Sequence, residues 1–348
     1  MSSFEEYLKI KCTLVGIDIG YDSVKVIALK KNHGAILKSA NIVMIPYDKS
    51  LEQKQANLTK ISQTIQTALK TAKPKISEKT AVSGLPESKV FTKVIQVPKM
   101  TDEELETALP YEAARHIPLP QNEIYLDWKN LGEGAKDTLD ILIVAAPKFL
   151  VENYLSLFKQ IGIELIALET KPIAASRAII KKDEKQTILI LDIGAEATGI
   201  SIFDSESIKF TYTIPHGGNT LTKNIASTLK ISEEQAEKFK REVGFKKDSH
   251  PEIIKAMEPI MNDIIEEINN AIKYYESRTT PRREIAEIRI CGGGALTPKI
   301  ADYVHQNVGK KTIIANPFIN LNPGGPSLPQ EQILRLTTAV GLALREKY

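Results

Sequence analysis

TLVGIDIGYDSVKVIAL at residues 13–29 and TILILDIGAEATGISIF at residues 187–203 repeat one pattern half a chain apart. Each predicts an apolar strand that ends in Asp, then Ile-Gly, a tight polar turn and a second strand rich in β-branched residues. The amides of such a turn can form a nest for an anion, and glycine lets the backbone approach a phosphate closely. We therefore expect two facing hairpins that grip one polyphosphate, with Asp18 and Asp192 placed to hold a divalent cation through water.

Length and composition describe an ordinary globular protein. The 348 residues indicate about two domains. The fractions of hydrophobic residues, 42%, and charged residues, 26%, exclude disordered, collagen-like and disulfide-scaffold classes. The formal net charge is only +3, with both signs interspersed, so no nucleic-acid partner is expected. Cys12 and Cys291 lie in apolar, strand-like runs and are interpreted as buried thiols of a reducing compartment.

The sequence predicts no membrane span. No apolar run approaches the roughly 18 to 20 residues that a membrane helix needs. The first residues, MSSFEEYLKIKC, lack the hydrophobic region of a signal peptide, so a cytoplasmic location is expected. Phe4, Tyr7 and Leu8 share one helical face that could touch a membrane surface or a partner, but a frayed leader is the simpler interpretation.

The order of predicted elements divides the chain into two α/β halves with mixed sheets, because a strand triplet followed by helices occurs twice. Residues 86–166 offer a compact unit of their own, which includes a capping box at Thr101 and a final helix at 147–161. The charged connector KKDEKQ, at 181–186, is the best boundary between the halves. The first predicted domain, 1A, contains residues 1–85 and is completed by 167–185 and a C-terminal helix at 330–348. An inserted subdomain, 1C, contains residues 86–166. Domain 2A contains residues 186–230 and 286–329, and a helical subdomain, 2B, contains residues 231–285.

Residues of the two turns carry the predicted phosphate chemistry. Lys25, on the strand after the first turn, could reach terminal phosphates, although an exposed strand lysine would look the same. In the second turn, which contains Gly194 and Ala195, the Thr198 hydroxyl could contact a phosphate or a water on the cation. Both turns therefore predict phosphate contacts.

HGGNTLT, at residues 216–222, ends a predicted strand and opens a helix. Backbone amides at a helix start attract anions, so Gly217 and Gly218 could lie beside a phosphate. A plain strand-to-helix turn would also use glycine, and the pattern alone leaves both interpretations open.

EQAEKFKREVG, at residues 234–244, predicts a helix in which Glu237, Lys240 and Arg241 share one face. A carboxylate and an ammonium could bind ribose hydroxyls, and a guanidinium could stack on adenine. The alternative is a solvated ion pair.

ICGGGALTPKI, at residues 290–300, places three glycines between a predicted strand and a helix. Gly292, Gly293 and Gly294 indicate close approach by something flat or by another stretch of backbone.

In this order the motifs resemble those of the actin-like ATPase superfamily, and more narrowly those of the PilM family of type IV pilus assembly proteins. Residues 86–166 correspond to the extra subdomain that this family shares with the division protein FtsA. The family-like segments are ALPYEAARHIPLPQNEIYLDW at 108–128, LIVAAPKFLVENYLSLFKQIGIE at 142–164, IPHGGNTLTKNIA at 214–226 and TTAVGLALR at 337–345.

The resemblance implies an α/β fold, the duplicated actin-like (ribonuclease H-like) two-domain ATPase fold with an inserted α+β subdomain, and it implies ATP and Mg²⁺ as ligands. It assigns no catalytic residue. The implied metal residues are Asp18 and Asp192. The implied phosphate residues are Asp18, Gly20, Ser23 and Lys25 at the first site, and Asp192, Gly194, Ala195, Thr198, Gly217 and Gly218 at the second. The implied ribose and adenine residues are Glu237, Lys240 and Arg241, with Gly292, Gly293 and Gly294 beneath the base.

The resemblance also implies a partner, the short N-terminal cytoplasmic tail of an inner-membrane PilN-like protein, held in a groove that involves the inserted subdomain. Such a partner would keep the protein at the inner face of the cytoplasmic membrane. Self-association is a further possibility. Two alternatives remain open: a filament-forming division or shape actin of the FtsA or MreB kind, and a small-molecule kinase.

Two residues depart from the family pattern. Asp22 stands in the first turn where relatives usually have a small hydroxyl residue, and it would repel a phosphate unless it turns outward. Lys171 stands where related sequences commonly have Glu, and an ammonium cannot order the cation or the attacking water as that carboxylate would. Slow or absent ATP hydrolysis is therefore expected.

Overall fold

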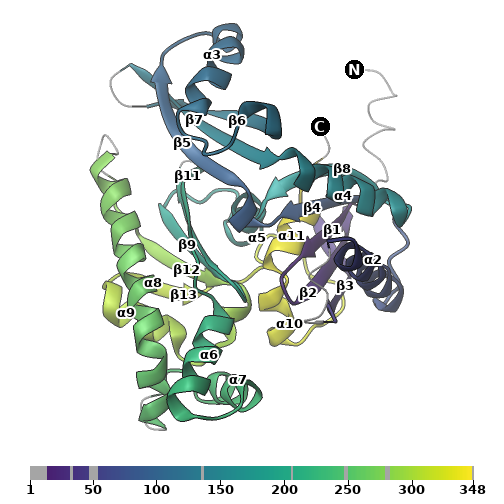
Figure 1. The fold of residues 1–348 in the computed structure, drawn as a ribbon, viewed down its shortest axis with the longest axis vertical. Helices are drawn as coiled ribbons and strands as arrows, with labels where there is room; N and C mark the ends of the chain where they lie inside the picture. Colours follow the sequence, from purple (N-terminus) through teal and green to yellow (C-terminus); the bar gives the residue numbers. More distant parts are fainter. Residues whose placement is uncertain are drawn as a thin grey trace. The chain divides into compact units, whose positions relative to one another are not determined.

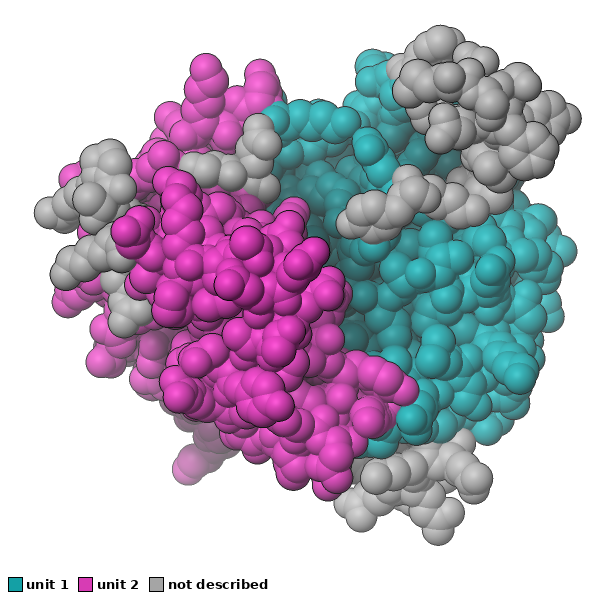
Figure 2. Space-filling view, turned by 90° about the horizontal axis from the view of Figure 1, so that it is seen from above, with its two compact units in different colours: residues 1–86, 149–182, 316–348 teal, residues 87–148, 183–315 magenta. Residues whose placement is uncertain are grey.

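The computed structural model describes residues 14–31, 34–46, 54–134, 137–204, 207–246, 250–278 and 283–346. The predicted leader face of Phe4, Tyr7 and Leu8, and Cys12, lie outside the described residues. The chain forms two compact units, coloured separately in Figure 2. The first unit contains residues 1–86, 149–182 and 316–348, and the second contains residues 87–148 and 183–315.

The first unit is built on a five-stranded sheet in the order β3-β2-β1-β4-β8 (Figure 1). The first three strands are antiparallel neighbours, whereas β4 and β8 continue the sheet in parallel. Helices α2 and α4 pack with β1 and β2 in one core, and α5 and α11 pack in another with β4. The strands are β1 (Val15–Ile19), β2 (Ser23–Lys31), β3 (Ala35–Met44), β4 (Thr80–Leu85) and β8 (Glu164–Thr170), and the helices are α2 (Lys54–Thr71), α4 (Lys148–Gln160), α5 (Lys171–Ile179), α10 (Gln330–Arg335) and α11 (Thr337–Ala343).

The second unit repeats this sheet in the order β11-β10-β9-β12-β13. Again three antiparallel strands are followed by two parallel ones, so the predicted duplication of mixed α/β sheets is confirmed. The strands are β9 (Ile188–Ile193), β10 (Thr198–Asp204), β11 (Ser207–Ile214), β12 (Glu287–Cys291) and β13 (Lys311–Ile314), and the helices are α6 (Gly218–Leu229), α7 (Glu233–Glu242), α8 (Pro251–Arg278), the short η3 (Gly293–Leu296) and α9 (Ile300–Val308).

Residues 87–148 add a three-stranded antiparallel sheet, β5-β7-β6, with one long helix. The predicted capping box at Thr101 is present at the start of that helix. Leu105 and Leu109 of the helix are fully buried against the sheet. The elements are η1 (Glu87–Lys89), β5 (Phe91–Pro98), α3 (Asp102–Ala114), η2 (Gln121–Glu123), β6 (Ile124–Glu133) and β7 (Thr138–Pro147).

The three-stranded sheet and the helix that follows it group with different units. The helix expected to close the insertion is α4, and its Leu157 and Phe158 are buried in the core of the first unit, so the separate sheet ends with β7. The insertion is grouped with the second unit, where the Thr211 hydroxyl donates to the Thr92 carbonyl over 3.1 Å. The finer division into 1A, 1C, 2A and 2B stays a prediction.

The C-terminal segment forms two helices, α10 and α11, where one helix was expected. Leu336 lies between them in a non-helical conformation. Helix α11 approaches its neighbours very closely, since a Cβ on Gly341 would lie 1.7 Å from the Ala174 carbonyl oxygen and one on Gly16 would lie 2.0 Å from that of Ala339. This close contact fixes α11 against β1 and α5 of the first unit.

Candidate functional site

The first hairpin places a carboxylate and an ammonium side by side. Asp18 on β1 is the direct cross-strand partner of Lys25 on β2, so both side chains leave the same face of the sheet. The turn closes through a hydrogen bond from the Gly20 amide to the Ser23 carbonyl over 2.9 Å. A Cβ on Gly20 would lie 2.7 Å from Lys25 Nζ and 3.0 Å from the Ser23 carbonyl oxygen, so a side chain there would displace the flexible end of Lys25.

Asp18 is held by two lysines. Its Oδ2 lies 3.2 Å from Lys25 Nζ, and its Oδ1 lies 2.9 Å from Lys171 Nζ. The Asp18 side chain is 5% exposed. Burial alone would raise the pKa of the carboxyl, but the ammonium groups of Lys171 and Lys25 outweigh burial and hold the pKa of Asp18 well below its usual range. The three side chains together carry a charge of +1.

Two further residues lie at this hairpin and were not predicted from the sequence. Arg335 of α10 reaches the turn, with Nη2 3.4 Å from Ser23 Oγ and 3.8 Å from Asp22 Oδ2. Asp22 also accepts a hydrogen bond from Ser23 Oγ over 2.7 Å, so its charge is compensated. Tyr154 of α4 lies near Lys171 and Asp18, and burial raises its pKa to about 12.

The second hairpin is fastened to the start of α6. The carbonyl oxygens of Gly194 and Ala195 accept hydrogen bonds from the amides of Gly218 and Asn219 over 2.9 and 2.8 Å. Thr198 is fully buried and donates its hydroxyl to the carbonyl of His216 over 2.7 Å. These hydrogen bonds hold the second hairpin against the start of α6.

The amides predicted to lie beside a phosphate have protein acceptors in this structure. The Gly218 amide donates to Gly194, and the Gly217 amide donates to Thr220 Oγ1 over 3.4 Å. A Cβ on Gly217 would also lie 2.6 Å from the Ala195 carbonyl oxygen. The plain strand-to-helix turn therefore accounts for both glycines, and their phosphate role stays a prediction.

Lys240 of α7 is buried and ties this helix to α6. Its Nζ donates to the Gly218 carbonyl over 2.8 Å and to Thr222 Oγ1 over 2.7 Å, and it lies 2.6 Å from Glu237 Oε2. An ammonium has three donors, and these acceptors account for all of them. Lys240 is therefore a buried contact between α6 and α7 and not one half of a solvated ion pair.

Glu237 and Arg241 keep more contact with solvent. Arg241 is half exposed and donates from Nε to Glu237 Oε1 over 2.6 Å. Burial would raise the pKa of Glu237. The charge of Lys240 and the hydrogen bonds that the Glu237 carboxylate accepts outweigh burial and lower this pKa. Of the three predicted ribose and adenine residues, these two retain exposed polar surface.

The three glycines after β12 have different surroundings. Gly292 has a φ of +78°, and a Cβ there would lie 2.2 Å from Asp192 Oδ1. A Cβ on Gly294 would lie 2.2 Å from the side chain of Ile193. Beside Gly293, a Cβ would meet no heavy atom within 4 Å. Packing against the end of β9 therefore explains two of the glycines, and Gly293 alone leaves room for a flat group.

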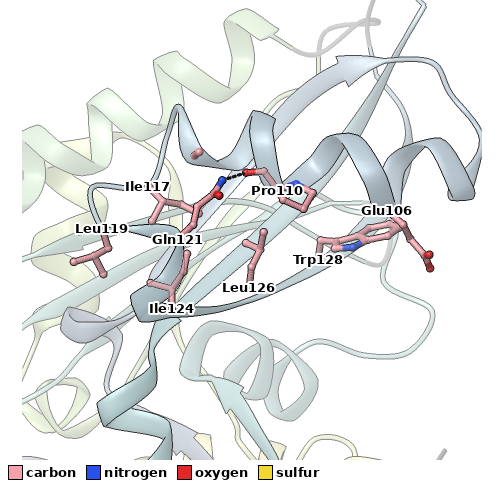
Figure 3. Close-up of a pocket in the computed structure, with 9 residues that line it drawn as sticks. Glu106, Pro110, Ile117, Leu119, Gln121, Ile124, Leu126 and Trp128 are labelled. Atoms are coloured by element: carbon pink, nitrogen blue, oxygen red, sulfur yellow. Dashed lines mark hydrogen bonds between the residues drawn. The ribbon is translucent and has the colours of Figure 1, made fainter.

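A pocket of about 330 Å³ lies between α3 and β6 (Figure 3). Ile124, Leu126 and Trp128 alternate along β6 and face it, because every second residue of a strand points to the same side. The other lining residues are Glu106, Pro110, Ala114, Ile117, Leu119 and Gln121. This stretch is family-like in sequence, but nothing in its pattern predicts a pocket.

A model of the family described as type IV pilus assembly protein PilM matches residues 16–347 of this chain. The chain belongs to the PilM family. Cell division protein FtsA of Enterococcus faecalis is 27% identical over 280 residues, which are 72% of this chain and 62% of that relative. The chain therefore spans less than two thirds of the length of this FtsA.

Solved structures confirm the actin-like fold of this PilM-family chain. A PilM-PilN type IV pilus biogenesis complex is similar with a TM-score of 0.78 and 23% identity, over 96% of this chain and 98% of that one. MreB5 of Spiroplasma citri bound to AMPPNP is similar with a TM-score of 0.54 and 15% identity, over 94% of each chain. The predicted fold class and family are therefore both confirmed.

The predicted magnesium ligands, Asp18 and Asp192, stay a prediction as a pair. Asp18 and Asp192 belong to different units, and both oxygens of Asp18 face ammonium groups. Within the described ranges, no group of three or more His, Cys, Asp or Glu side chains could hold a metal ion. The two-carboxylate magnesium assignment stays a prediction, and the donor set at Asp18 argues against a direct bond there.

Proposed function

We propose that this PilM-family protein is an ATP-binding, actin-like scaffold of type IV pilus or related secretion machinery. In this role it binds the N-terminal cytoplasmic tail of a PilN-like inner-membrane protein and lies at the inner face of the membrane through that partner. The family match over residues 16–347 carries the proposal, and the complex of PilM with PilN among its structural neighbours supports the partner. None of the helices in the described part of the chain is long and apolar enough to cross a membrane.

The nucleotide part of the proposal rests on the two hairpins and the residues around them. Lys25, Lys171 and Arg335 supply positive charge at the first hairpin, where phosphates would bind. In the second unit, Gly293 leaves room for the base, and Arg241 keeps an exposed guanidinium that can stack on it. The MreB neighbour, which was solved with AMPPNP, supports a nucleotide as the ligand of such a fold.

Gly293→Val is expected to weaken ATP binding by at least about tenfold, which corresponds to about 1.4 kcal/mol. The valine side chain would enter space that holds no heavy atom near Gly293, so it would meet the base rather than the protein. Isothermal titration calorimetry measures the affinity, and thermal unfolding checks that stability is unchanged. Equal affinities of the variant and the wild type would show that the base does not lie beside Gly293.

The pocket between α3 and β6 is the proposed docking site for the partner tail. In its three-stranded sheet, β6 pairs with β7 alone among the described strands, so its other edge can accept an extended peptide. The apolar residues of β6 would receive an apolar side chain of that peptide. Glu106 is the one charged residue that lines the pocket, and α3 carries further acids in its first turn. We infer a tail that combines an apolar anchor with a basic residue.

Leu126→Asp is expected to weaken binding of the PilN-like N-terminal peptide by about tenfold to a hundredfold, because burying a leucine side chain contributes about 1.5 to 3 kcal/mol. Fluorescence anisotropy of the labelled peptide measures this. Leu155→Asp is the matched control, since Leu155 is an exposed leucine on α4. If only the control weakened binding, the tail would dock elsewhere, and if the wild type bound no tail, the proposed partner would be wrong.

We propose that the nucleotide and the tail are coupled and that hydrolysis is slow or absent. Repeating the anisotropy titration at saturating ATP measures the coupling, for which about 1 to 3 kcal/mol is typical. Phosphate release over hours measures the hydrolysis. A turnover rate typical of kinases, about 1 to 100 per second, would contradict the scaffold role.

A further inference from the structure

The first hairpin already contains a cation beside the carboxylate that the metal was expected to use. Lys171 is the first residue of α5 and follows β8 directly. Its Nζ lies 2.9 Å from Asp18 Oδ1, and its stem packs over Gly84, where a Cβ would lie 3.6 Å from Lys171 Cγ. The lysine side chain is 19% exposed, so it is fixed beside Asp18 while part of it remains open to solvent.

The charges around Asp18 are those of an anion site. A carboxylate that faces a hydrated magnesium ion presents a charge of −1, whereas Asp18, Lys25 and Lys171 together present +1. Asp22 and Arg335, the other charged pair at this turn, cancel each other. A divalent cation that approached Asp18 would meet two ammonium groups, while a triphosphate would be attracted by the same group of side chains.

We propose that Lys171 is a built-in counter-ion that replaces the divalent metal at the first phosphate hairpin, so that this chain binds ATP with little dependence on magnesium. The inference rests on the proposed nucleotide function and adds to it the charge that neutralises the phosphates. In this role Lys171 is a binding residue, because it holds Asp18 on one side and would face the phosphates on the other. A glutamate at this position would leave Asp18 with one lysine and an added negative charge, and a metal would then be needed.

The test is ATP affinity measured by calorimetry, once with excess magnesium and once with a chelator, on the full chain. The wild type is expected to bind ATP almost equally under both conditions. For Lys171→Glu, the affinity without metal is expected to fall by about tenfold or more, the effect of losing one charge-assisted hydrogen bond, and magnesium is expected to restore most of it.

Two further variants keep the test decisive. Lys171→Met keeps the length of the stem over Gly84 but removes the charge, so it reports on the ammonium even if the glutamate variant folds poorly. It is also expected to bind ATP more weakly without metal than with it. Lys159→Glu, on an exposed residue at the end of α4, makes the same change in net charge away from the hairpin and is expected to match the wild type.

Several outcomes would overturn the inference. If the wild type bound ATP only in the presence of magnesium, Lys171 would not replace the metal, and the nucleotide function would still stand. If Lys171→Glu and Lys171→Met both bound metal-free ATP as tightly as the wild type, the lysine would have only a structural role. If the wild type bound no ATP under either condition, the nucleotide function would be wrong together with this inference.

Discussion

Asp18→Ala is expected to lower the free energy of unfolding by about 3 kcal/mol, because it leaves two lysines facing each other without their shared carboxylate. Removing one partner of a buried ion pair costs about 3 to 5 kcal/mol, and the lower value applies since Lys25 and Lys171 are 12% and 19% exposed. Chemical denaturation measures the effect. The double variant Asp18→Ala, Lys171→Met is expected to recover part of the loss, because only one ammonium then remains.

The loss of stability in Asp18→Ala is expected to be largest at neutral pH and to shrink in acid. The pKa of Asp18 is depressed in the folded chain below its ordinary value of 3.8, chiefly by Lys171 and Lys25 acting against burial. The contribution of the carboxylate is therefore fully present above pH 3.8 and is lost as the pH falls toward the depressed pKa. Unfolding curves of the wild type and of Asp18→Ala should differ most at neutral pH. A difference that grew on acidification would contradict the ion-pair explanation.

Gly292→Ala is expected to destabilise the second unit by on the order of 3 kcal/mol, from backbone strain and overlap together. Gly292 has φ +78° and ψ −179°, a conformation that is essentially restricted to glycine. In addition, the new methyl group would lie 2.2 Å from Asp192 Oδ1 and 2.6 Å from the Ile193 carbonyl oxygen. Thermal unfolding monitored by circular dichroism measures the loss.

Gly293→Ala is the matched control for this change. It alters the adjacent residue in the same way, but no heavy atom lies within 4 Å of the new Cβ, so stability should change by less than about 0.5 kcal/mol. Equal destabilisation by both variants would show that the glycines share one structural role, and it would remove the reason to assign Gly293 to the nucleotide base.

Much of the fold was predictable from local sequence. The repeated strand-turn-strand pattern predicted both hairpins, and the structure places Asp18 and Asp192 at corresponding ends of β1 and β9. The capping box at Thr101 predicted the start of α3. These features depend on residues that are close in sequence, so that periodicity and turn chemistry are enough to reveal them.

Contacts between distant segments were not predictable in the same way. Lys171 departs from the family pattern in sequence, but only the fold brings it to Asp18, because β8 lies two strands away from β1 in the sheet. Arg335 is separated from Ser23 by 312 residues and carries no local signal for the hairpin. Lys240 had the spacing of a surface ion pair, and its burial follows from the packing of α7 on α6.

The sequence by itself therefore determined the duplicated α/β plan, the two Asp-bearing hairpins and the membership of the PilM family. Only the tertiary structure decided which charges surround Asp18, which of the three glycines after β12 has open space beside it, and that α3 and β6 enclose a pocket. The reason is physical: strands, turns and caps are set by neighbours in the chain, whereas charge pairing and cavities are set by side chains that only folding brings together.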